Sequence, residues 1–163
     1  MRILGIDPGY AIVGFGIIDL NNYQTEVVDY GVITTPKEQR LPERLHHIYN
    51  CIKEIIKTYK PDVVAIEELF FFKNLTTAIP VAEARGVIVV ACKECGVDIY
   101  EYTPLQIKQA LTGNGRAEKK QIQYMVKLLL NLQQIPKPDD AADALAVAIC
   151  HSQINPNLNV NRM

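Results

Sequence analysis

The sequence predicts an α/β fold, and three observations lead to this prediction. Residues 2–33 are apolar runs separated by short turns, which is the pattern of a strand meander. After Pro36 the apolar residues recur at helical spacing instead. Farther along the chain, short apolar runs lie between longer helical segments. The resulting order of three strands, helix, strand, helix, strand and further helices is typical of one mixed α/β domain.

Three strands are predicted in the N-terminal part of the chain, over residues 2–6, 11–20 and 25–33. Pro8-Gly9 separates the first two apolar runs, and Asn21-Asn22 separates the second from the third. These residue types favour tight turns, so we expect the three strands to form a meander.

The first predicted helix follows Pro36 and ends near Tyr59, before Pro61. Its apolar residues lie on one helical face: Leu41, Leu45, Ile48, Ile52, Ile55 and Ile56. The next apolar run, Asp62 to Glu67, is short and nearly continuous, which favours an inner strand that is buried on both faces.

A second helix is predicted over residues 80–95, where Gly96 closes it, and a fifth strand over residues 97–102. Thr103 is a good N-cap residue, and Pro104 suits the first position of a helix. We therefore expect a further helix to begin there and to run to about Leu111.

Glycine interrupts the chain in the segment 112–116, and two more helices are predicted over residues 117–132 and 140–153. We expect residues 1–154 to form a single domain. The polar segment 155–163 is expected to be a frayed C-terminal tail.

The composition limits the possible classes of protein. With 163 residues, 48% of them hydrophobic and 21% charged, the chain is long enough to bury one core. Its four cysteines follow no disulfide framework, and the sequence starts directly with the apolar run "RILGID". The longest apolar run, Gly86 to Cys92, is far shorter than the roughly 20 residues of a membrane span. We expect a soluble cytoplasmic protein with reduced thiols.

Two carboxylates follow predicted strands. Asp7 comes at the end of the first strand and Glu67 at the end of the inner strand, where open α/β sheets expose their functional crevice. Asp7 could instead be an ordinary turn residue before Pro-Gly, and Glu67 a strand-end charge that faces solvent. Glu68 is an equally placed candidate on local evidence.

Two more carboxylates lie on one face of the last predicted helix. Asp140 and Asp143 are three residues apart, and the helix from Ala141 to Cys150 is otherwise apolar on every side. The alternative interpretation is an N-capping aspartate followed by a first-turn carboxylate that complements the helix dipole.

A shared site for these acids would require a cation, because burying several carboxylates together is unfavourable without one. Mg²⁺ is the usual ion where a phosphate is the remaining ligand. Two such ions can activate a water and stabilise the leaving oxygen of a phosphodiester. The acids therefore predict a metal-dependent phosphodiester hydrolase.

The net charge of −1 argues against a protein that coats nucleic acid by charge alone. Residues 104–127 are locally basic, however, with only Glu118 opposing Lys108, Arg116, Lys119, Lys120 and Lys127. Such a face suits phosphate contacts, although it could also be a solvated helix surface. The loop Gly113-Asn114-Gly115 would allow the backbone to approach a phosphate.

Five ordered motifs carry a resemblance across nearly the whole chain: "ILGIDPGY", "VVAIEELFFFKN", "ARGVIVVA", "GNGRAEKKQ" and "DDAADALAVAICH". Together they resemble the RuvC family of bacterial Holliday-junction resolvases, which are crossover junction endodeoxyribonucleases of the RNase H-like superfamily. The resemblance implies a mixed five-stranded sheet flanked by helices on both faces.

The resemblance also implies an activity. A homodimer would resolve four-way DNA junctions by paired symmetric nicks in opposing strands, during homologous recombination and DNA repair. Carboxylate-bound Mg²⁺, two ions per site with Mn²⁺ as a substitute, would activate the water. The branch-migration proteins RuvA and RuvB are the implied partners.

The family's functional residues fall on named positions of this sequence. Its catalytic, metal-binding acids correspond to Asp7, Glu67, Asp140 and Asp143, and the motif "AIE" selects Glu67 over Glu68. Its active-site lysines correspond to Lys108 and Lys119, with Lys120 as a close competitor for the second. The resemblance further assigns DNA binding to this set: Phe70, Lys108, Arg116, Lys119 and Lys120.

Phe70 is expected to project toward the junction and to help open base pairs near the scissile site, as apolar wedges do in proteins that deform DNA. Phe71 and Phe72 stay undecided between packing and DNA contact.

A dimer is also predicted from the helix that contains residues 87–91, because its apolar residues cover more than one face. In the RuvC family the corresponding helix lies in the dimer interface. The alternative is a helix that is fully internal.

Three other functions compete with junction resolution. One is an RNase H-like nuclease that processes ribosomal RNA precursors, and another is a module that binds branched DNA without cutting it. An actin-like ATPase or sugar kinase would need two such domains.

Overall fold

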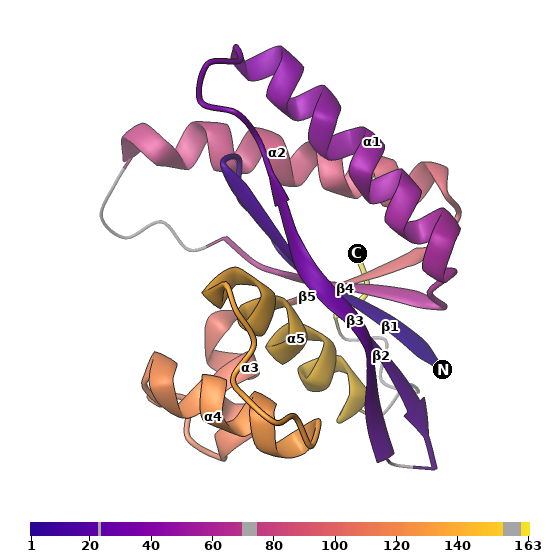
Figure 1. Cartoon of the computed structure of the whole chain (residues 1–163), viewed down its shortest axis with the longest axis vertical. Helices are drawn as coiled ribbons and strands as arrows, with labels where there is room; N and C mark the ends of the chain where they lie inside the picture. Colours follow the sequence, from indigo (N-terminus) through magenta and orange to yellow (C-terminus); the bar gives the residue numbers. More distant parts are fainter. Residues whose placement is uncertain (23, 70–74, 155–160) are drawn as a thin grey trace.

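The computed structural model describes residues 1–22, 24–69, 75–154 and 161–163. Its centre is a five-stranded mixed sheet with the strand order β3-β2-β1-β4-β5 (Figure 1). The strands are β1 (Arg2–Asp7), β2 (Ile12–Asn21), β3 (Gln24–Thr34), β4 (Val63–Glu67) and β5 (Asp98–Tyr102). The first three strands form the predicted antiparallel meander, whereas β1, β4 and β5 run parallel. The predicted strand order along the chain is confirmed.

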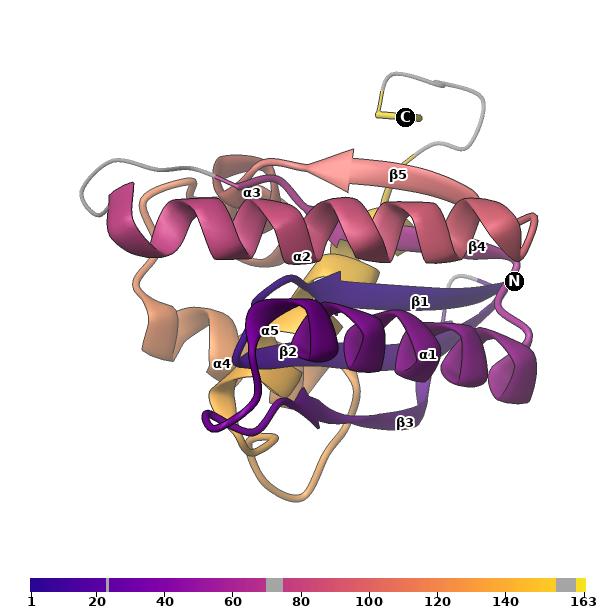
Figure 2. The same cartoon turned by 90° about the horizontal axis from the view of Figure 1, so that it is seen from above.

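Helices cover both faces of the sheet, as predicted. The helices are α1 (Leu41–Tyr59), α2 (Leu75–Glu94), α3 (Pro104–Thr112), α4 (Lys119–Leu129) and α5 (Asp139–Ser152). Figures 1 and 2 show α1 and α2 together on one side of the sheet and α3, α4 and α5 on the other. None of these helices, within the described residues, is long and apolar enough to cross a membrane.

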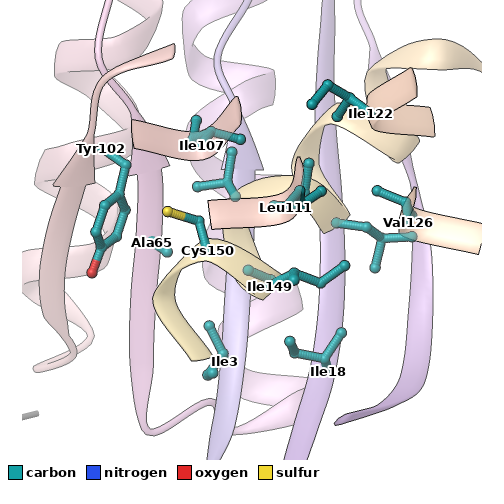
Figure 3. Packing of buried hydrophobic residues seen from close by; sticks show 14 of the residues in the cluster. Ile3, Ile18, Ala65, Tyr102, Ile107, Leu111, Ile122, Val126, Ile149 and Cys150 are labelled. Atoms are coloured by element: carbon teal, nitrogen blue, oxygen red, sulfur yellow. The ribbon is translucent and has the colours of Figure 1, made fainter. Parts of the chain in front are cut away.

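Strand β1 supplies both layers of the core because its side chains alternate. Ile3 is buried in the cluster beneath α5, whereas Leu4 and Ile6 are buried in the cluster beneath α1 and α2. Figure 3 shows Ile149 and Cys150 of α5 packed between the strands and helices α3 and α4. The same alternation places position 7 on the α5 face of the sheet.

Helix α5 lies unusually close to the sheet because glycines face it. A Cβ on Gly5 would lie 2.1 Å from the carbonyl oxygen of Ala144, and a Cβ on Gly14 would lie 2.0 Å from that of Asp140. No side chain fits in either place. The absence of these two side chains therefore brings the N-terminal end of α5 against the ends of β1 and β2.

Most predicted boundaries agree with the structure to within two residues, and three predictions differ more. Helix α2 begins at Leu75, five residues before the predicted start, with Pro80 inside it. A proline near the start of a helix removes a single backbone hydrogen bond, so it does not have to mark the first turn. Helix α4 is shorter than predicted, ending at Leu129. At the C-terminus, where we expected a frayed tail, the N–H of Met163 donates to the carbonyl of Ile99 at 2.9 Å.

Candidate active site

Asp7 and Glu67 end two neighbouring parallel strands on the same face of the sheet. In β4, Ala65 packs in the cluster beneath α5 and Ile66 in the cluster beneath α1 and α2, so Glu67 returns to the α5 face. Glu68 lies one residue beyond β4, and its charge acts on the Arg85 guanidinium of α2. The structure thus distinguishes the two glutamates that local sequence left equivalent.

Helix α5 brings the second pair of acids to this edge. Asp7 is paired across the sheet with Gly14, the residue on which the backbone of Asp140 rests. The helix begins at Asp139 with Pro138 as its N-cap, so Asp140 is not the capping residue. Asp143, one turn farther along, is half-buried on the same helix. The N-cap alternative for Asp140 is therefore wrong.

The pKa values of these acids reflect how closely their carboxylates lie together. Burial, together with the negative charges of Glu67, Asp143 and Asp140, raises the pKa of Asp7 to about 8. Burial and the neighbouring Asp143 raise the pKa of Glu67 to about 7. The pKa of Asp143 is raised by burial as well. These acids repel one another in a poorly solvated place, which is the environment that favours binding of a cation.

Lys119 is the cation that the protein itself supplies. Its Nζ donates to Asp143 Oδ2 at 2.8 Å and lies 3.8 Å from Asp139 Oδ2. Lys119 is the first residue of α4, and the preceding N–H, that of Glu118, donates to Gln121 Oε1 at 2.8 Å. The start of α4 is thus fixed beside the start of α5.

A cavity of about 240 Å³ opens beside the acids. Its polar lining consists of Glu67, Asp143, Lys108 and Lys119, and its apolar lining includes Ile107 of α3. Lys108 also lowers the pKa of Glu67 through its charge. The cavity therefore brings together two of the predicted acids and both predicted active-site lysines.

The donor set fits a hard divalent cation, because all of its members are carboxylate oxygens. Across residues 1–22, 24–69, 75–154 and 161–163, however, no three His, Cys, Asp or Glu side chains are already placed to hold a metal ion. Asp143 points one oxygen at the Lys119 ammonium instead.

The other predicted DNA-binding residues lie around this site or outside the described residues. Lys120 follows Lys119 on α4 and makes no ion pair with any residue that the structure describes. Arg116 is exposed in the loop between α3 and α4. Phe70, like Phe71 and Phe72, lies outside the described residues.

The glycine loop has less free backbone than the sequence suggests. The N–H of Gly115 donates to Gln109 Oε1 at 3.0 Å, and that of Arg116 donates to Asn114 Oδ1 at 3.0 Å. The N–H of Asn114 donates to Thr112 Oγ1 at 3.1 Å. These donors are already occupied, so the expected backbone approach to a phosphate is not favoured. The loop instead presents the side chain of Arg116.

Sequence reasoning missed two features of the site. Asp139 contacts both Lys119 and Lys137, and the doublet Asp139-Asp140 was the available signal. The glycines that seat α5 were also missed, although Gly14 and Gly16 alternate along one face of β2, the pattern of a close backbone approach.

Comparisons with known proteins agree with this arrangement. The family profile described as crossover junction endodeoxyribonuclease RuvC matches residues 3–151. A relative of that name from Brevibacillus brevis is 53% identical over 161 residues, which cover 99% of this chain and 97% of the relative. One from Alkaliphilus metalliredigens is 59% identical over 152 residues, 93% of each chain.

Solved structures are similar as well. RuvC from Thermus thermophilus superposes with a TM-score of 0.86 at 35% identity, covering 93% of each chain. RuvC of the same organism in complex with Holliday junction substrate gives a TM-score of 0.90 at 31% identity, covering 100% of each chain. The profile, the relatives and the strand-end acids lead to one conclusion: this chain belongs to the RuvC family of crossover junction endodeoxyribonucleases.

Proposed function

We propose that this protein resolves four-way (Holliday) DNA junctions by paired symmetric nicks in opposing strands. The observation that carries the proposal is the convergence of half-buried Asp7, Glu67 and Asp143 with Lys119 at one edge of the sheet. The chain has this arrangement within a RuvC match over residues 3–151, and a similar RuvC structure contains Holliday junction substrate.

Asp7, Glu67, Asp140 and Asp143 would hold Mg²⁺, two ions per site, with Mn²⁺ as a substitute. Bound there, the metal would supply an activated water and stabilise the leaving oxygen of the phosphodiester. The role of the chain is to hold Asp7, Glu67 and Asp143 together in a poorly solvated place, where a bound cation would offset the repulsion between their carboxylates.

The basic residues would position the DNA strand. Lys108 and Lys119 line the cavity beside Glu67 and would contact the scissile phosphate. Arg116 and Lys120 would contact flanking phosphates. Phe70, three residues after Glu67 in the sequence, would unstack a base near the nicked bond.

A homodimer would present two such sites to a two-fold junction. Its interface would include helix α2, where Val90 is 54% exposed and Ile79 is 67% exposed. Val87 and Val90 also line a shallow, mainly apolar groove between α2 and α1. These exposed apolar side chains disfavour the alternative of a fully internal helix and support a partner surface. RuvA and RuvB would associate with this dimer on the junction.

A synthetic four-way junction incubated with the protein and Mg²⁺ tests the proposal. Wild type should nick two opposing strands at symmetric positions, whereas Asp7→Asn and Glu67→Gln should bind the junction but cut at least about 100-fold more slowly, because each removes a metal ligand. Glu68→Gln is the matched control and should cut within a few-fold of wild type.

Other results would contradict the proposal. Cleavage of linear RNA but not of the junction would favour the nuclease that processes ribosomal RNA precursors. Tight junction binding with no cleavage at any Mg²⁺ concentration would favour the non-cleaving module.

A further inference from the structure

We propose that Lys119 is a built-in competitor of the metal: its ammonium neutralises Asp143 in the metal-free protein and is displaced when a divalent ion binds. The inference rests on the proposed function, because it assumes that the acids around Asp143 bind a metal. It goes further by assigning Lys119 two positions, one on Asp143 and one away from it. The affinity for the metal then depends on which position the ammonium occupies.

The contacts of Lys119 place it inside the cluster of acids. Its Nζ is 2.8 Å from Asp143 Oδ2, the distance of a direct charge-assisted hydrogen bond. Its charge also lowers the pKa of both Asp7 and Glu67. One ammonium thus interacts with three of the four predicted metal ligands.

A divalent ion and this ammonium would compete for the same acids. Two cations close together on one side chain repel each other, and the repulsion is strong where water is partly excluded. The Lys119 ammonium already contacts Asp143 Oδ2, where a metal bound to that oxygen would be a second cation on the same atom. Asp143 therefore binds either the Lys119 ammonium or the metal, and each of the two weakens binding of the other.

Lys119 has room to move. It is 56% exposed, and its long side chain extends from the first residue of α4. Asp139 Oδ2 already lies 3.8 Å from its Nζ, outside the predicted ligand set. Lys119 and Lys108 both line the cavity beside Glu67. A displaced ammonium can therefore rest near Asp139 or face the cavity, where a DNA phosphate would meet it.

Binding of Mn²⁺ to the free protein, without DNA, measures the competition directly. The metal is titrated into wild type, Lys119→Gln, Lys119→Arg and Lys120→Gln, and bound ion is followed by electron paramagnetic resonance at pH 8.5. At this pH Asp7 and Glu67, with pKa values of about 8 and about 7, are largely deprotonated. Protonation of the acids then does not mask the effect of the lysine.

Lys119→Gln should bind Mn²⁺ at least about fivefold more tightly than wild type, because the competing charge is gone. Lys119→Arg retains the charge and should stay close to wild type. Lys120→Gln is the matched control, since it removes the same charge one residue away, and it should change the affinity by less than about twofold. Lys119→Gln should nevertheless cut the junction more slowly, and this opposite change in metal affinity and cleavage rate would identify the exchange.

Three outcomes overturn the inference. If Lys119→Gln binds Mn²⁺ no more tightly than wild type while wild type still cuts junctions, Lys119 does not compete with the metal and the proposed function stands. If Lys120→Gln tightens Mn²⁺ binding as much as Lys119→Gln does, the effect comes from the loss of any nearby positive charge and not from the contact between Lys119 and Asp143. Absence of Mn²⁺ binding to wild type, together with absence of junction cleavage, would remove the proposed function as well.

Discussion

At the scale of single residues, burial decides which acids matter. The chain has 18 Asp and Glu residues, so the residue type alone selects none of them. Asp7 and Glu67 differ from exposed carboxylates because neighbouring acids and a packed helix exclude much of the water around them. Glu68, one residue beyond the strand, acts on the Arg85 guanidinium of α2 instead. A one-residue step along the chain thus separates a candidate metal ligand from a charge near α2.

The raised pKa of Asp7 predicts how the stability of the metal-free protein depends on pH. The pKa is about 8 in the folded protein and 3.8 ordinarily, so between these values the folded state binds a proton that the unfolded state does not. The free energy of unfolding must therefore fall as pH rises from about 4 to about 8. Asp7→Asn removes this contribution and should be more stable than wild type at pH 8, by more than about 1.4 kcal/mol, the equivalent of one pKa unit.

Urea denaturation in EDTA at pH 5 and pH 8 checks this expectation. The readout is the difference in the free energy of unfolding between Asp7→Asn and wild type. This difference in the free energy of unfolding should be larger at pH 8 than at pH 5. Added Mg²⁺ should reduce the difference by stabilising wild type alone. An equal difference at both pH values would show that Asp7 is not desolvated as the fold implies.

At the scale of elements, the position of α5 is the central fact of the site. The helix carries Asp140 and Asp143, but glycines on β1 and β2 determine how near to Asp7 they come. Helix α4 then brings Lys119 to the same place, and α3 brings Lys108. Three helices and two strands, distant along the chain, each contribute one part of the site.

Gly14→Ala tests how closely α5 packs against β2. The added Cβ would lie 2.0 Å from the carbonyl oxygen of Asp140, so either the helix or the strand must shift. We expect a loss of about 1–3 kcal/mol in the free energy of unfolding and weaker binding of Mn²⁺, because the shift moves Asp140 away from Asp7.

Chemical denaturation and Mn²⁺ titration measure the two effects of Gly14→Ala. Gly86→Ala is the control, since a Cβ there meets no atom within 4 Å. It should unfold at the same denaturant concentration as wild type or at a slightly higher one, because alanine favours a helix over glycine. Unchanged stability in Gly14→Ala would mean that α5 is not held against β2 as tightly as the backbone distances indicate.

At the scale of the whole molecule, the candidate active site lies on one face of the sheet and the proposed dimer surface on the other. Helices α3, α4 and α5 cover the face with the acids and lysines, and α1 and α2 cover the other (Figure 2). The molecule has a net charge of −1, yet Lys108 and Lys119 of the basic segment 104–127 line the cavity beside Glu67 and Asp143. Local placement rather than total charge would therefore provide the DNA affinity.

Val90→Glu tests the proposed dimer. The side chain is 54% exposed, so the substitution should leave the fold intact while placing a charge in the apolar interface. Wild type should sediment as a dimer at micromolar concentration and Val90→Glu as a monomer.

The substitution Leu128→Glu is the control for this experiment, because Leu128 is 51% exposed on α4, away from α2. It should sediment as wild type does. A wild-type monomer at micromolar concentration would contradict both the interface and the symmetric nicking that depends on it.

The sequence by itself determined the order of the elements, the strand-end and helix positions of the four acids, and, through its motifs, the family. These follow from periodicity, turn residues and local spacing, which act over a few residues and can be read along the chain. The start of α2 was misplaced because a proline is tolerated near the start of a helix.

Only the tertiary structure decided which groups meet. It separated Glu67 from Glu68 and placed Lys119, rather than Lys120, on Asp143. It also used Gly5 and Gly14 to bring α5 onto the sheet. The physical reason is that these contacts join segments as far apart as residues 7 and 143, whose distance depends on packing and on the absence of side chains between them. Local preference along the chain carries no information about such distances.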